Sequence, residues 1–152
     1  MGTTFVGTKD RGFWMHDSLL ELWLRLLALH LEDPSSTESS PVPGIRDQWL
    51  LASRGYFNGC VPHGLEDALA TQEGNSAVRE AVQSLMRALS AAPAYISKDA
   101  LNLLGFSGSS FEADIETRRL SEIGQAFLDL LDGKIHYGPA DTSFMPGSRT
   151  VR

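Results

Sequence analysis

Hydrophobic residues recur along this chain with the spacing of amphipathic helices, and the strongest such pattern covers residues 14–33. This stretch, WMHDSLLELWLRLLALHLED, contains the longest apolar run in the sequence. At about 100° per residue, Glu21, Arg25, Ala28 and Glu32 fall on one narrow stripe, and nearly everything else is apolar. We therefore expect a central helix that the rest of the domain covers on most sides.

The start and the buried side of this helix can be assigned from the same pattern. Ser18 and Glu21 have the spacing of a capping box, in which a hydroxyl and a carboxylate satisfy free amides at a helix start. Trp23 and His30 fall opposite the polar stripe, on the most buried line. Because burial disfavours the charged imidazole, we expect His30 to be neutral and hydrogen-bonded rather than catalytic.

Five further stretches carry helical signals, and turn residues bound them. They cover residues 45–54, 65–71, 76–91 after an Asn75 cap, 97–104 after a Ser97 cap, and 117–131. Gly124 lies in the apolar stripe of the last stretch, although glycine costs about 1 kcal/mol relative to alanine inside a helix. We expect this glycine to permit the close approach of a neighbouring helix or ring.

The remaining segments lack a regular period. Residues 1–13 resemble an extended arm, residues 33–44 are rich in serine and proline, and residues 56–64 and 105–116 contain loops. Alternating β-branched runs do not occur, so strands are not expected. The predicted fold class is all-α: a compact bundle of five to six helices around the central N-terminal hydrophobic helix, with long loops. We expect one domain over residues 1–138 and a C-terminal tail over 139–152.

Composition narrows the function classes. The formal net charge is −6, the pI is about 5.1, and the only lysines are Lys9, Lys98 and Lys134, so the basic face of a nucleic-acid-binding protein is missing. The apolar run from residue 19 to residue 31 is interrupted by charged residues and is shorter than the roughly 20 residues that span a bilayer. No signal-peptide pattern begins the chain. We expect a cytoplasmic protein that binds neither nucleic acid nor membrane.

The sequence contains no motif that requires a particular chemistry. Cys60 is the only cysteine, and the Cys-x-x-His spacing of Cys60 and His63 supplies two ligands, which do not close a metal site. Glycine-rich phosphate loops and the common catalytic motifs are missing. We therefore expect no metal, no cofactor and no catalytic residues. The alternative is a small enzyme or ligand-binding helical domain, with a site around His16, Cys60 and His63.

Acidic residues gather before the last predicted helix. Glu112, Asp114 and Glu116 alternate with apolar residues there. They serve as solvated carboxylates at the helix start, or they form an acidic edge that attracts a basic partner. The predicted partner-binding residues are these three together with residues next to the turn at 56–64: Phe57, Asn58, Glu66 and Asp67.

Three segments together carry a resemblance to a known group of proteins. They are Gly12-Phe13-Trp14 with the run DSLLELWL at 17–24, RDQW at 46–49 continuing to Gly55 and NGC at 58–60, and FLDLLDG at 127–133. This combination resembles small bacterial immunity proteins of polymorphic toxin systems. The resemblance covers roughly residues 12–133, and it rests on fold-type residues rather than on a catalytic signature.

The resemblance implies an inhibitor that binds a cognate toxin domain inside the producing cell and blocks its active site. An acidic inhibitor fits a basic toxin, such as a nuclease. The apolar length of the first predicted helix also permits a homodimer, which we keep as a separate possibility.

Overall fold

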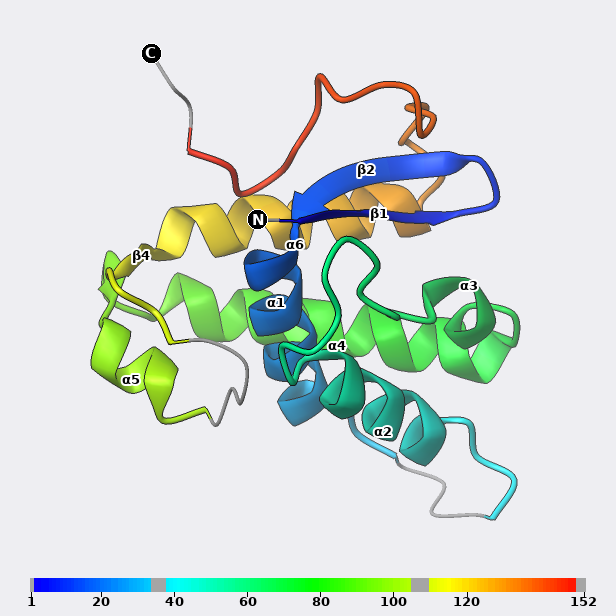
Figure 1. Cartoon of the computed structure of the whole chain (residues 1–152). Coiled ribbons are helices and arrows are strands. Elements are labelled where there is room, and N and C mark those ends of the chain that lie inside the picture. The colour runs from blue at the N-terminus through cyan, green and yellow to red at the C-terminus, as the bar shows by residue number, and fades with distance from the viewer. Residues whose placement is uncertain (1, 34–37, 105–109, 150–152) are drawn as a thin grey trace.

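The computed structural model describes residues 2–33, 38–104 and 110–149 (Figure 1). Four strands and six helices are present in these ranges. In chain order they are β1 (Thr3–Thr8), β2 (Arg11–His16), α1 (Asp17–His30), α2 (Val42–Ala52), α3 (Leu65–Ala68), α4 (Gln72–Ser90), β3 (Tyr95–Ile96), α5 (Lys98–Asn102), β4 (Ile115–Glu116) and α6 (Thr117–Leu131).

The all-α prediction is wrong, because two small antiparallel sheets accompany the helices. β1 and β2 form a hairpin from the segment that was predicted to be an extended arm. Gly7 and Gly12 are paired across it, and a Cβ on Gly12 would lie 2.0 Å from the Val6 carbonyl oxygen. These glycines therefore allow the backbones of β1 and β2 to approach closely. They do not mark the irregular segment that was predicted from the sequence. The second sheet pairs the short β3 and β4.

α1 is central, as predicted, but its polar side was assigned incorrectly. It packs against α2 and α4, and Trp23 is fully buried. The helix begins at Asp17 without a side-chain cap, so the predicted capping box is absent. Glu21 is only 5% exposed, whereas Leu29 is 64% exposed. His30 is half-buried rather than buried, and its Nδ1 lies 2.9 Å from the Ser84 hydroxyl oxygen.

The later helices occur where the pattern predicted them, with differences at their starts. α2 and α4 begin three to four residues early, and Thr71 rather than Asn75 caps α4, its hydroxyl accepting a hydrogen bond from the Gly74 N–H at 3.0 Å. Ser97 caps α5, as predicted, and α6 has the predicted bounds. Residues 34–37 and 105–109 of the predicted loops lie outside the described residues.

Three helices meet at Gly124, as its place in the apolar stripe predicted. A Cβ on this residue of α6 would lie 2.1 Å from the Met86 sulfur on α4 and 3.1 Å from the Trp23 ring on α1. The Trp23 and Phe127 rings pack beside this contact, with centroids 5.6 Å apart. Figure 1 shows α1 running across α4 and α6, which lie side by side.

Residues 137–149 form what we call the C-terminal strap, which crosses over β2 to α6 (Figure 1). The Tyr137 carbonyl accepts a hydrogen bond from the Gly12 N–H at 2.9 Å, and the Gly147 carbonyl accepts one from Arg119 Nε at 2.6 Å. Between these points the Phe144 ring packs against Phe13, with centroids 6.0 Å apart. The expected tail therefore lies over the surface and is attached at both ends of its described part.

The described part of the chain contains no helix with the length and apolar character needed to cross a membrane.

Candidate functional site

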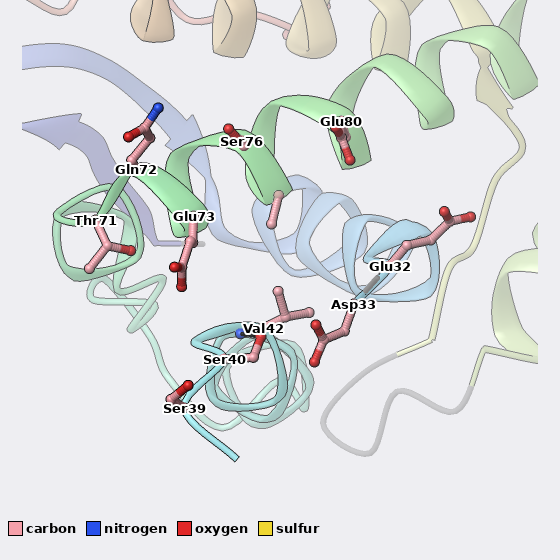
Figure 2. Close-up of a pocket in the computed structure, with 11 residues that line it drawn as sticks. Glu32, Asp33, Ser39, Ser40, Val42, Thr71, Gln72, Glu73, Ser76 and Glu80 are labelled. Carbon is pink, nitrogen blue, oxygen red and sulfur yellow. Dashed lines mark hydrogen bonds between the residues drawn. The ribbon is translucent and has the colours of Figure 1, made fainter. Parts of the chain in front are cut away.

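An acidic groove lies between the end of α1, the start of α2 and the first half of α4 (Figure 2). Its volume is about 560 Å³. It is lined by Glu32, Asp33, Ser39, Ser40, Val42, Thr71, Gln72, Glu73, Ser76, Ala77 and Glu80. Figure 2 shows Glu73 and Glu80 on the α4 side and Glu32 and Asp33 at the end of α1. Among the described residues, four carboxylates and no basic side chain therefore line this groove.

Local packing fixes the α4 wall of the acidic groove. The Thr71 hydroxyl caps the helix, and a Cβ on Gly74 would lie 2.0 Å from the Ala68 carbonyl oxygen. Only glycine permits this approach of the α3 end to the first turn of α4. Glu73 and Glu80 are seven residues apart, so two helical turns place them on the same side of α4.

The opposite wall is held by contacts between α1 and α2. Val42 is 4% exposed and anchors the start of α2 in the core. Arg46 donates a hydrogen bond of 2.7 Å from its guanidinium to the Leu31 carbonyl, which joins α2 to the end of α1 just before Glu32. Arg46 therefore has a structural partner.

A positively charged residue lies beyond one end of the groove. A smaller cavity of about 140 Å³ shares Glu32 and Glu80 with it, and Arg87 and His30 also line that cavity. Positive charge therefore lies beyond the part of the groove that Glu32 and Glu80 line. Carboxylates arranged around such a hollow can bind ammonium or guanidinium groups.

The predicted acidic edge is largely engaged within the fold. The Asp114 carboxylate accepts a hydrogen bond from the Lys98 backbone N–H at 2.9 Å, and Glu116 lies 3.3 Å from the guanidinium of Arg118. Glu112 is exposed. Asp114 therefore contacts the first residue of α5 rather than α6, and Glu116 precedes α6 without a side-chain cap hydrogen bond.

Two of the other predicted partner-binding residues, Glu66 and Asp67, lie on α3 (Figure 1). Glu66 is exposed and accepts a 3.3 Å hydrogen bond from the Lys9 backbone N–H. Asp67 lines a cavity of about 320 Å³ that shares Thr71 with the acidic groove. In the preceding loop Asn58 is exposed and Phe57 is half-buried. The structure thus brings Asp67 near the acidic groove and leaves the acidic edge far from it.

The three residues of the alternative site have different surroundings in the structure. His63 donates from Nε2 to the Phe5 carbonyl at 3.0 Å, while its Nδ1 accepts from the Leu65 N–H at 3.1 Å. Burial lowers the pKa of His63, so both ring nitrogens serve the fold in the neutral state. Cys60 is exposed, and His16 lines a different cavity beside α6. The described residues contain no group of three His, Cys, Asp or Glu side chains arranged to hold a metal ion.

The sequence reasoning missed the acidic groove because its carboxylates come from separate segments. The spacing of Glu73 and Glu80 was a usable signal, because it places both on one helical face. The approach of residues 32 and 33 to that face depends on the packing of α1 against α4. The pattern of residues along the chain does not predict this packing of α1 against α4.

Comparison with known proteins assigns no family to this chain. No protein-family model, curated protein or solved structure matches it.

Proposed function

We propose that this chain is an immunity protein that binds a cognate bacterial toxin domain and inhibits it stoichiometrically inside the producing cell. The acidic groove is the proposed contact surface, and a basic segment of the toxin is its proposed occupant. The observation that carries the proposal is the convergence of Glu32, Asp33, Glu73 and Glu80 on a groove without a basic lining residue. Opposite charges on two partners speed their encounter and favour the correct orientation.

The distribution of charge along the chain supports the same surface. Residues 32–80 contain eight acidic residues and three arginines, which accounts for most of the net charge of −6. This segment includes α2 and the first half of α4, which line the acidic groove, and α3, which lies between them in the chain. The resemblance of residues 12–133 to immunity proteins points to the same class of partner.

Capture of the neighbouring gene product tests the proposed function. The tagged full-length protein is co-expressed with the product of the adjacent upstream gene, purified and titrated against it. We expect a one-to-one complex and growth rescue of cells that express the toxin. Absence of a complex with any toxin-like neighbour, together with no rescue, would contradict the proposal.

Matched charge reversals test the proposed surface. The Glu73→Lys/Glu80→Lys variant changes the acidic groove, and Glu112→Lys/Glu116→Lys makes the same charge change at the acidic edge. We expect the first to slow association about tenfold or more at low salt and the second to change it by less than about twofold. The opposite result would move the contact to the acidic edge. Equal melting temperatures would show that both variants are folded.

A further inference from the structure

The cavity of about 320 Å³ that Asp67 lines, here called the α2–α3 pocket, adjoins the acidic groove. Pro41, Ile45 and Ala68 contribute apolar surface to its walls. Thr71 borders both hollows, and Figure 2 shows it at the end of the acidic groove away from the end of α1. The α2–α3 pocket therefore extends the surface to which the proposed function assigns the partner.

Two side-chain N–H groups in the walls of the α2–α3 pocket already have acceptors within the fold. Gln48 donates from Nε2 to the Pro62 carbonyl at 2.6 Å, and Trp49 donates from Nε1 to the His63 carbonyl at 2.9 Å. A Cβ on Gly64 would lie 3.2 Å from Gln48 Cγ, so the Gln48 side chain is closely packed in this position. Its amide oxygen is left to accept hydrogen bonds from a ligand that brings donors.

Asp67 gives the α2–α3 pocket a negative charge that no neighbour neutralises. The residue is exposed, and among the described residues its carboxylate has no hydrogen bond or ion pair. Burial lowers the pKa of His63, which also lines the pocket, and both nitrogens of this neutral ring are engaged within the fold. No described lysine or arginine lines the pocket. A ligand therefore meets apolar walls, a carboxylate and an amide oxygen.

We propose that the α2–α3 pocket binds an arginine side chain of the partner protein. The aliphatic stem of the arginine packs against Ile45 and Ala68, because long charged side chains cover apolar surface while the charged group stays at the rim. The planar guanidinium carries five N–H donors, which suit the carboxylate of Asp67 and the amide oxygen of Gln48 together. The identity of the partner rests on the proposed function, but the recognition of arginine by this pocket does not.

Amides of arginine and citrulline test this proposal without the partner protein. Nα-acetyl-arginine amide is titrated into the full-length protein, and the NMR signals of the Trp49 indole and the Gln48 side-chain amide are followed. Nα-acetyl-citrulline amide is the matched control, because it has a similar shape and no charge. We expect the arginine probe to shift both signals saturably and the citrulline probe to bind about tenfold more weakly, because it loses charge-assisted hydrogen bonds.

Three variants separate this pocket from general electrostatic attraction. Asp67→Asn removes the carboxylate, and Asp99→Asn makes the same change on the exposed surface of α5. We expect the first to weaken binding of the arginine probe about tenfold and the second to weaken it by less than about twofold. Glu73→Gln/Glu80→Gln changes the acidic groove and should leave the shift of the Trp49 signal in place.

Several outcomes would overturn the proposal. They are equal binding of the citrulline probe, an unchanged affinity of Asp67→Asn, and the lack of a saturable shift. Equal binding of Nα-acetyl-lysine amide would overturn the assignment to arginine. Tighter binding of free L-arginine, whose carboxylate Asp67 repels, would show a site for the free amino acid instead. Capture of a toxin without binding of the arginine probe would contradict this proposal alone, and the reverse result would contradict the proposed function alone.

Discussion

Asp17 shows how one side chain can hold several segments of this fold. Its carboxylate accepts hydrogen bonds from the Thr4 hydroxyl at 2.7 Å and from the Gly59 N–H at 2.6 Å. The Thr4 hydroxyl in turn accepts one from the Val61 N–H at 3.0 Å. The start of α1, β1 and the loop before α3 are thus fixed to one another. The sequence predicted a carboxylate at a helix start, but not these partners, because they are 13 to 57 residues apart.

The neighbouring Glu21 should make stability depend on pH. Burial and, to a lesser extent, the charge of Asp17 raise the pKa of Glu21 from 4.5 to about 7. The folded state therefore retains a proton that the unfolded state loses, so stability falls as the pH rises from about 4.5 to 7. We expect Glu21→Gln to remove up to about 3 kcal/mol of this decline. Urea unfolding between pH 4.5 and 8 measures it.

Asp47→Asn is the matched control, because Asp47 is exposed on α2. It should leave the decline of stability with pH as in the unchanged protein. Parallel curves for Glu21→Gln and the unchanged protein would show that Glu21 is not the group responsible.

Two helical glycines should respond oppositely to alanine. A Cβ on Gly74 would lie 2.0 Å from the Ala68 carbonyl oxygen, whereas a Cβ on Gly44 meets nothing within 4 Å. We expect Gly74→Ala to lower the free energy of unfolding by about 2 kcal/mol, since backbone must move. Gly44→Ala should be neutral or raise it by up to about 1 kcal/mol. Thermal unfolding compares the two, and stabilisation by Gly74→Ala would contradict the close contact.

At the scale of elements, helices were predictable and the hairpin was not. α6 has strong periodicity from residue 117 to residue 131 and a left-handed Gly133 after its end, so local signals sufficed. Alternation of apolar and polar residues is weak in β1 and β2, because the polar Thr4 and the glycine at position 12 are both buried. The hairpin depends on burial against α6 and the C-terminal strap, which are more than 100 residues away.

The C-terminal strap should contribute to stability, although it lies beyond the predicted domain boundary at residue 138. Truncation after Gly138 removes Phe144 and exposes Phe13, so we expect a loss of about 3 kcal/mol in the free energy of unfolding. Truncation after Arg149 is the control and should leave stability unchanged. Chemical denaturation of the two truncated forms measures this loss. Equal free energies of unfolding would show that residues 139–149 are dispensable for stability.

At the scale of the whole molecule, charge was predictable as a total and not as a surface. The sequence shows a net charge of −6, and two of the three carboxylates that it favoured for partner binding, Asp114 and Glu116, make contacts within the fold. The acidic groove instead arises where α1, α2 and α4 meet. Local sequence therefore predicts the sign of the total charge, whereas packing determines where the carboxylates converge.

Association with a basic partner should depend strongly on ionic strength. Screening shortens the reach of exposed charges to about 10 Å at 0.1 M salt and about 3 Å at 1 M. We expect the association rate to fall about tenfold or more between 0.02 and 0.5 M salt, while dissociation changes less. Stopped-flow measurements with the captured toxin test this, and a rate independent of salt would contradict electrostatic recognition.

The hydrogen bond between the Trp14 indole and the Pro139 carbonyl joins residues 125 positions apart. On the ribosome, Trp14 of β2 is made 125 residues before Pro139 of the C-terminal strap that packs on it. During most of that interval Phe13 lacks its Phe144 partner. The newly made chain therefore carries an open strand edge and an exposed ring until the C-terminal strap is released, and a partner or chaperone has its best access to the hairpin in that period.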